Sequence, residues 1–190
     1  MDVYEAIEKR RTIRIFKNGA SEEQLRKIIL AGTKAPSGRN CQPWEFIVVD
    51  DQKIIDQMAE LKYQLLKDMP FRHGETQGET ERRALNQKKW FKNASVVAVC
   101  HRLGPDGEPS AWLCIENMLL AAVAEGLGSG IVTYWGEGKR EAEKILGLPK
   151  DYALTAIVKF GVPGEEGFSR EKNPTAPRRP EFSWLHKNRF

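Results

Sequence analysis

Residues 112–127 constrain the fold more than any other part of the chain, because they form a long segment that is apolar on nearly every side. Its hydrophobic residues recur at helical spacing, and the few polar residues between them leave almost no polar face. A helix of this kind is buried, either in the core of a domain or in an interface between subunits. The glycine-rich segment 126–130 is expected to end the helix.

Shorter elements are predicted on both sides of this segment. Hydrophobic periodicity and a capping box from Ser21 to Gln24 predict helices at 3–11, from 22 to before Pro36, at 53–69, at 81–92 and at 139–146. Apolar runs predict strands at 44–49, 95–100, 131–134 and 153–162. Helices outnumber strands, and only two strands are separated by an obvious helix of βαβ length, so we expect a layered α+β domain.

The composition is that of an ordinary globular protein, with 190 residues, 41% hydrophobic and 29% charged. A chain of this length buries enough surface for one core, so we expect a single domain over 1–190. No apolar run approaches the roughly 20 residues of a membrane span, and the first residues do not resemble a signal peptide. Cys41, Cys100 and Cys114 form no CxxC pair and the histidines are scattered, so we expect no metal site and a cytoplasmic location.

Two segments differ in character from the rest of the chain. Residues 61–92 are the most polar excursion, and we expect a lid or a surface arm there rather than core. Residues 163–190 hold much of the proline and show little periodicity, yet they end in several aromatic residues. Aromatic residues in a polar tail indicate that this C-terminal arm docks on another surface.

Basic residues cluster near both ends of the chain, although the net charge is only +4. Guanidinium groups match phosphate oxygens in pairs, and a threonine hydroxyl adds a neutral donor. Taken alone, each cluster is also consistent with a solvated basic surface, so both interpretations stay open. The residues concerned are Arg10, Arg11, Thr12, Arg14, Arg178 and Arg179.

Two further segments have a composition suited to a ligand site. In 35–44, prolines and a glycine fix the backbone while amide side chains offer donors and acceptors, although a structured turn before a strand is an equal alternative. In 126–133, glycines allow the backbone to approach a ligand closely, or they form a helix C-cap with a tight turn. The second segment follows a helix and lacks GxGxxG spacing, which excludes a Rossmann dinucleotide site.

The ordered set of these motifs resembles the FMN-dependent nitroreductase family over nearly the whole chain. The motifs are R-R-T-x-R after a short helix, P-S-x-x-N-x-Q-P-W before a strand, G-L-G-S-G after a long apolar helix, G-L-P at 147–149, and a basic pair before a late proline. The resemblance implies an α+β fold, a three-layer α-β-α sandwich built as an intertwined homodimer. It also implies that the 112–127 helix lies in the dimer interface, that the C-terminal arm is exchanged between subunits, and that both chains contact each FMN.

The resemblance further implies the residues of a flavin site. Arg10, Thr12 and Arg178 are expected to bind the FMN phosphate, with Arg11 and Arg179 in the same basic motifs. Arg14 is expected at the N1/O2 side of the isoalloxazine ring, where a cation stabilises the anionic reduced flavin. The residues expected to line the ring and ribityl chain are Pro36, Ser37, Gly38, Asn40 and Gln42. Those expected to face flavin N5 are Ile131, Val132 and Thr133.

The implied reaction is hydride transfer from NADH or NADPH to flavin N5, followed by transfer to a nitroaromatic, a quinone or a similar acceptor in a ping-pong cycle. The family commonly needs no acid–base side chain, so we nominate no catalytic residue. Many members of the family have glycine at the position of Thr133. A side-chain hydroxyl of Thr133 that donates to flavin N5, as in the deiodinase-like branch, would favour one-electron steps. Acceptor choice is expected to rest with the lid, whose aromatic residues are Tyr63, Phe71, His73, Trp90 and Phe91, although an exposed helix with solvated charges is an equal alternative there.

Other functions stay open. A reductive dehalogenase or an ene-type reductase of the same family differs only in its acceptor, and a flavin-binding protein without turnover would not react with NAD(P)H. A nucleic-acid binder fits least, because only 72–92 approaches a basic element with interleaved aromatic residues. We therefore expect a second copy of the chain and a small-molecule acceptor as partners, and neither nucleic acid nor membrane.

Overall fold

A five-stranded sheet forms the centre of this computed structural model, which describes residues 1–70, 73–164 and 178–189. The strand β5 (Tyr152–Pro163) pairs antiparallel with three other strands, the longest of which is β3 (Ser95–Arg102). On its other edge, β3 pairs antiparallel with β2 (Trp44–Val49). The strand β4 (Gly128–Val132) pairs with a part of β5 that β3 also contacts, so it lies on the opposite edge of β5. The last residues of β5 pair with β1 (Phe16–Gly19).

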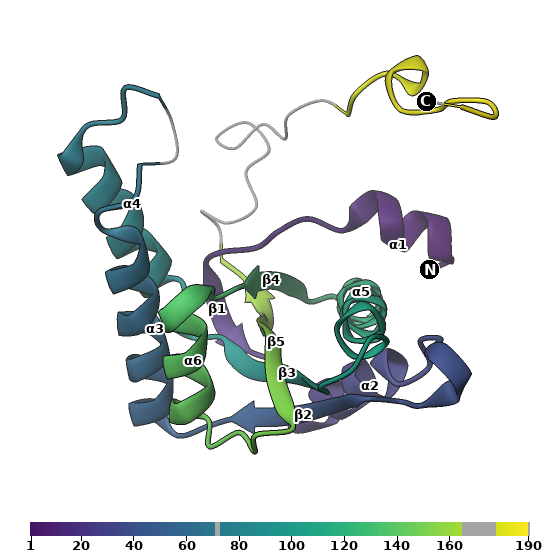
Figure 1. Ribbon diagram of the computed structural model, residues 1–190, viewed down its shortest axis with the longest axis horizontal. Helices are drawn as coiled ribbons and strands as arrows, with labels where there is room; N and C mark the ends of the chain where they lie inside the picture. Colours follow the sequence, from purple (N-terminus) through teal and green to yellow (C-terminus); the bar gives the residue numbers. More distant parts are fainter. Residues whose placement is uncertain (71–72, 165–177, 190) are drawn as a thin grey trace.

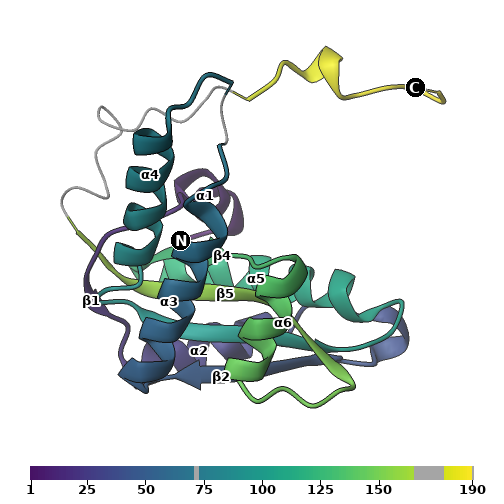
Figure 2. The ribbon, with the colours of Figure 1, turned by 60° about the vertical axis from the view of Figure 1, so that its left-hand side comes forward.

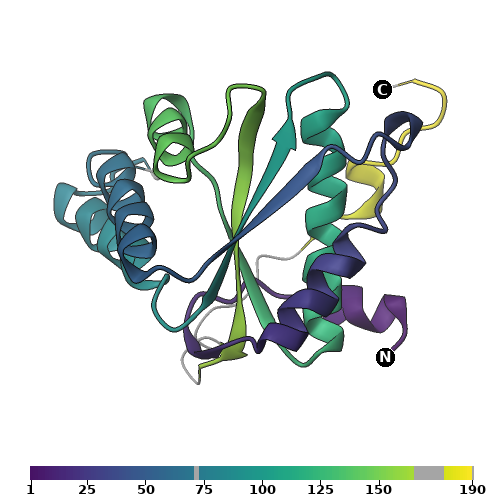
Figure 3. The same ribbon diagram turned by 90° about the horizontal axis from the view of Figure 1, so that it is seen from below.

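Helices cover both faces of the sheet, as Figures 1 and 3 show. One face packs on α2 (Glu22–Gly32) and α5 (Gly107–Ala124), and the other on α3 (Gln52–Leu66) and α6 (Gly136–Ile145). Successive side chains of a strand point to opposite faces, so Val97 and Val99 join the core under α5 while Val96 and Ala98 join the core under α3. This burial on both faces explains the continuous apolar sequence of β3, and the α+β three-layer arrangement is the one expected.

The long apolar helix is α5, and it ends in a Schellman motif. Gly126 has a φ of +74°, its N–H donates to Val123 O (3.0 Å), and Leu127 N–H donates to Ala122 O (2.8 Å). Most of the helix is buried in the core, whereas Trp112 and Leu113 are 36% and 50% exposed. Two large apolar side chains of α5 are therefore uncovered in a single chain.

Two helices form a hairpin at one side of the sheet, where the lid was expected. They are α3 and α4 (Gln77–Lys89), and α4 begins at a capping box made by Thr76 and Glu79. Figure 2 shows α4 outside α3 and reaching beyond the sheet. Tyr63 Oη donates to Glu81 Oε1 across the hairpin. Phe71 lies outside the described residues, and Phe91 is buried in the core under α3, so it faces no acceptor in this structure.

The two ends of the chain lie apart from the sheet. The short helix α1 (Val3–Lys9) packs on α5, and residues 178–189, with the 3₁₀ turn η2 (Glu181–Ser183), extend away from the sheet in Figures 1 and 2. Within that segment Phe182 is 83% exposed. In the described part of the chain, no helix combines the length and hydrophobicity needed to cross a membrane.

Several element boundaries differ from the predicted ones. The helices α5 and α4 begin at Gly107 and Gln77, both earlier than predicted, and β4 spans Gly128–Val132 instead of 131–134. The helix α6 begins at Gly136, earlier than predicted. The glycine-rich segment after α5 forms most of β4 in addition to ending the helix. The strand β1 is not predicted from the sequence at all.

Candidate functional site

The N-terminal basic segment, residues 10–14, lies along β4. Ile13 N–H donates to Ser129 O (2.7 Å), and Thr12 pairs with Ser129 as a parallel bridge. The basic segment can lie this close to β4 only because two residues of the strand are glycines. A Cβ on Gly130 would lie 2.4 Å from Ile13 O, and a Cβ on Gly128 would lie 2.5 Å from Ile13 Cγ1. These glycines therefore admit the chain's own backbone, and they bring the basic segment beside the start of the 131–133 turn.

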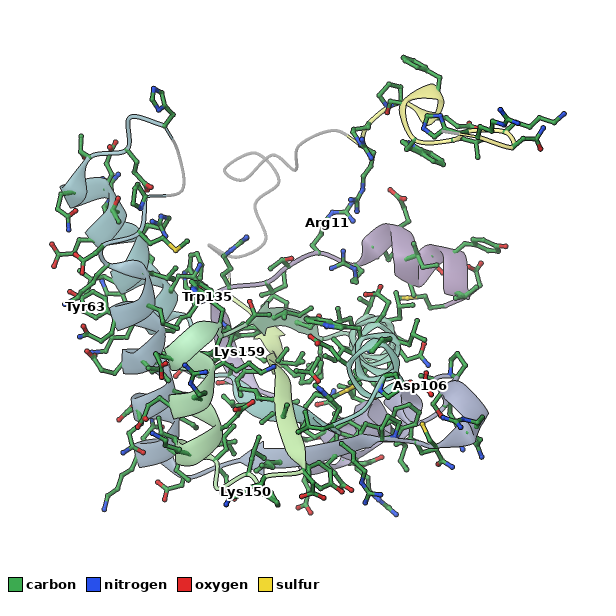
Figure 4. The ribbon with its side chains drawn as sticks, viewed as in Figure 1. Arg11, Tyr63, Asp106, Trp135, Lys150 and Lys159 are labelled. Atoms are coloured by element: carbon green, nitrogen blue, oxygen red, sulfur yellow. The ribbon has the colours of Figure 1, made fainter. Side chains whose placement is uncertain are left out.

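The three arginines of this segment have different surroundings. Arg10 Nε lies 3.7 Å from Glu116 Oε1 on α5. Arg11, labelled in Figure 4, follows α1; its Nη1 donates to Arg10 O (2.7 Å), and its Nε is buried without a hydrogen-bond partner among the described residues. Arg14 stacks on the ring of Trp90, 5.2 Å from the ring centroid. A buried N–H without a partner costs about 1–3 kcal/mol, and an anionic oxygen at this position would remove that cost.

Residues 131–135 leave the sheet beside the basic segment. Val132 is buried, whereas Ile131 is 39% exposed. The carbonyl oxygen of Thr133 accepts a hydrogen bond from Lys62 Nζ on α3 (2.7 Å). Burial lowers the pKa of Lys62 to about 8. Sequence reasoning did not single out Lys62; the available signal was its position one helical turn after Met58, on the buried face of α3.

A second buried lysine, Lys159 on β5, is also labelled in Figure 4. Its Nζ donates to Trp90 O (2.8 Å), the residue on which Arg14 stacks. Burial, and to a smaller extent the charge of Arg14, lower the pKa of Lys159 to about 7. This lysine is the one charged residue of the largely apolar strand β5, which was the sequence signal that could have identified it.

The loop at 36–42, including the 3₁₀ turn η1 (Gly38–Asn40), lies in another part of the molecule. Arg39 Nη2 lies 3.5 Å from Asp106 Oδ2, and Figure 4 shows Asp106 well away from Arg11. Three residues of the loop are left-handed, with φ of +52° at Arg39, +56° at Asn40 and +44° at Gln42. Such strain in residues other than glycine is concentrated at functional sites. One chain therefore does not bring this part of the expected site to the basic segment.

The other expected loop residues line this same constrained turn. Ser37 Oγ accepts a hydrogen bond from Gln42 N–H (3.0 Å). A Cβ on Gly38 would lie 2.5 Å from Asp106 Oδ2, so only glycine fits there without a shift. Pro36, Asn40 and Gln42 are exposed and available to a ligand or to another chain.

The C-terminal arginines, Arg178 and Arg179, are exposed in the segment that leaves the sheet. Trp184 Nε1 donates back to Arg179 O (3.1 Å), so this segment has local structure of its own. Within one chain the expected site is thus divided among a basic segment with its adjacent turn, a strained loop and a C-terminal arm.

Comparisons with known proteins show the family and the fold of the chain. The pattern of the nitroreductase family matches residues 7–162. The chain is 30% identical to an iodotyrosine deiodinase of Thermotoga neapolitana over 86% of its length and 89% of that protein, and 30% identical to an NADH dehydrogenase of Thermus thermophilus over 92% and 93%. A crystal structure of oxidised iodotyrosine deiodinase bound to FMN and 3-iodo-L-tyrosine superposes with a TM-score of 0.77 at 28% identity, covering 100% of both chains. The expected nitroreductase-like fold is confirmed; the intertwined dimer and the exchanged arm stay predictions.

Proposed function

Because the chain belongs to the nitroreductase family and is a flavin oxidoreductase of that family, we propose that it binds FMN and passes electrons from NADH or NADPH to a small acceptor. The acceptor class is a nitroaromatic, a quinone or a similar flat molecule. Relatives named as NADH dehydrogenases and NADPH-dependent oxidoreductases support NADH or NADPH as the reductant. The similar structure of an iodotyrosine deiodinase bound to FMN supports FMN as the cofactor.

One observation carries this proposal: the basic segment is fixed against β4 by the hydrogen bond from Ile13 N–H to Ser129 O. This contact fixes the backbone from which the side chains of Arg10, Arg11 and Thr12 extend. Thr12 is exposed, and the Nε of Arg11 has no hydrogen-bond partner among the described residues. Arginine forks and a hydroxyl suit the phosphate of FMN. The residues present therefore fit the group.

The ring of FMN fits beside the 131–133 turn. We assign Arg14 to the N1/O2 side, where its charge favours the anionic reduced form, and the turn at Thr133 to the N5 side. Bound there, FMN supplies hydride acceptance and electron transfer in a ping-pong cycle. The chain itself binds the cofactor, orients it and sets the electrostatic field around it, and no catalytic acid or base is assigned.

We propose that a second copy of the chain completes each site. The strained loop at 36–42 does not reach the basic segment of its own chain, so a homodimer in which each FMN contacts both chains brings the parts together. Apolar residues are exposed on α1, on α5 and in the C-terminal segment, as an interface requires, among them Tyr4, Trp112 and Phe182. Arg178 and Arg179 are assigned to the same site from the exchanged arm.

The absorption spectrum of the purified protein tests the cofactor and the class together. We expect a yellow protein that NADH or NADPH bleaches without oxygen. A colourless protein that does not take up FMN would refute the proposal, and bound FMN that neither nucleotide bleaches would indicate a flavin carrier. Arg10→Ala is expected to raise the Kd for FMN by a factor of about 10 to 100, since hydrogen bonds to charged groups contribute about 1.5–3 kcal/mol. Lys9→Ala, which removes an exposed neighbouring charge, is the matched control.

Hybrid dimers test the sharing of the site. A chain carrying Arg10→Ala is combined with a chain carrying Gln42→Ala. If each site takes its basic segment from one chain and its loop from the other, the hybrid has one intact site, and half of the bound FMN shows the wild-type Kd. If both parts come from the same chain, every site is damaged and no FMN binds with that Kd.

A reductive dehalogenase is the second candidate, favoured by the similarity to iodotyrosine deiodinases and by threonine at position 133. The overall step would consume two electrons and one proton, exchange an aryl carbon–iodine bond for a carbon–hydrogen bond, and release iodide. Iodide release from 3-iodo-L-tyrosine with reduced enzyme separates the candidates. Under this function we expect Thr133→Ala to lose iodide release while keeping nitro reduction.

The single domain over 1–190, the cytoplasmic location and the absence of nucleic-acid partners stay predictions.

A further inference from the structure

Lys62 is a buried lysine for which packing alone gives no reason. The residue is 6% exposed, and its Nζ donates to Thr133 O (2.7 Å). Among residues 1–70, 73–164 and 178–189, no carboxylate lies within ion-pair distance of it. Burying an ammonium group without a counter-charge costs several kcal/mol, whereas an apolar side chain of similar length would fill the same space at no such cost.

The surroundings of Lys62 hold the group in one place. Its Nζ lies 4.2 Å from the ring centroid of Trp135 and 5.7 Å from that of Tyr134. Tyr134 Oη donates to Met58 O (2.7 Å), one helical turn before Lys62. Two hydrogen bonds from neighbouring turns of α3 therefore fix residues 133 and 134. Figure 4 shows Trp135 at the end of α6, where it is the residue that precedes the helix.

The segment held in this way is the one assigned to flavin N5. We propose that Lys62 is a positioning residue of the flavin site, which fixes the turn at Thr133 and places a positive charge behind it that favours reduced over oxidised FMN. This inference rests on the proposed function. Burial lowers the pKa of Lys62 to about 8, which leaves the group mostly charged at pH 7. The charge would act through the peptide unit of Thr133, without contact to the acceptor.

Three substitutions separate the charge of Lys62 from its hydrogen bond. Lys62→Met removes both, Lys62→Gln removes the charge and retains an N–H donor on a side chain one atom shorter, and Lys62→Arg keeps a charge. Lys53→Met, on an exposed position of the same helix, is the matched control. The measurements are the Kd for oxidised FMN and the two-electron midpoint potential of the bound flavin at pH 7.

We expect Lys62→Gln and Lys62→Met to weaken the binding of reduced FMN about tenfold more than that of oxidised FMN, which lowers the midpoint potential by about 30 mV. Lys62→Arg and Lys53→Met are expected to keep the wild-type potential. If Lys62→Met does not fold, Lys62→Gln carries the test. Equal losses of affinity for both redox forms would show a purely structural role and overturn the inference. Failure of the wild-type protein to bind FMN would overturn the proposed function, and this inference with it.

Discussion

Replacing Lys159 with methionine should change how the stability of the protein depends on pH. Lys159 is 2% exposed on β5, and its Nζ lies 5.9 Å and 5.1 Å from the ring centroids of Phe16 and Phe91. Burial lowers its pKa from the ordinary 10.5 to about 7. Between these values the unfolded chain binds a proton that the folded chain does not, so the free energy of unfolding rises with pH.

The size of the effect follows from the two pKa values. From about pH 7 to about pH 9, the contribution of Lys159 to the free energy of unfolding increases by roughly 2 kcal/mol, which is lost again as the pH falls. The variant Lys159→Met lacks this contribution, while the other titratable groups are common to both proteins and largely cancel. Near pH 7 we expect the variant to be at least as stable as the wild type, since methionine removes a buried charge.

Urea unfolding at several pH values measures this difference, with protein and FMN concentrations held constant because both affect the apparent stability. The expected result is that the free energy of unfolding of the wild type rises relative to that of Lys159→Met by roughly 2 kcal/mol from about pH 7 to about pH 9. Lys150→Met, at an exposed position labelled in Figure 4, is the matched control for the loss of a lysine. A difference in the free energy of unfolding between wild type and Lys159→Met that does not change from about pH 7 to about pH 9 would refute the reasoning.

Two further predictions concern the construction of the site and of the hairpin. Gly130→Ala forces a Cβ against Ile13 O, so it should lower the free energy of unfolding by about 1–3 kcal/mol and weaken FMN binding. Gly78→Ala, whose Cβ meets nothing within 4 Å, should have neither effect. Equal effects of the two changes in urea unfolding and FMN titration would count against the close approach at β4. Thr76→Ala removes the cap of α4 and should destabilise that helix by about 1 kcal/mol, seen as faster amide hydrogen exchange in α4. Unchanged exchange in α4 would show that this cap does not hold the hairpin.

Local patterns in the sequence predicted the regular elements well. The strand Trp44–Val49 has the predicted bounds, and the capping box at Ser21 and Gln24 forms as expected. Both depend on nearest neighbours along the chain, namely on apolar alternation and on hydrogen bonds between residues three apart. The four residues of β1 show no such pattern, and they form a strand only because they pair with β5.

The arrangement of the site depended on contacts between distant segments, which a single sequence does not contain. Gly128 and Gly130 were compatible with a ligand or with a turn, and the structure shows that they admit Ile13. The residue type alone does not distinguish Lys62 and Lys159 from other lysines, because only the packing of α3 and β5 buries them. The separation of the 36–42 loop from the basic segment follows from the topology, and the family resemblance alone implied a site shared between chains.

The contact between Thr12 and Ser129 joins the beginning of the chain to its last third. During synthesis the arginines of the basic segment leave the ribosome early, but the strand on which they rest is made much later. A nascent chain that stops before residue 128 therefore has the arginines that we assign to the phosphate, yet lacks the surface that arranges them. Uptake of FMN would then mark a late event in biogenesis, and flavin absorbance would report completed folding rather than the presence of the motif.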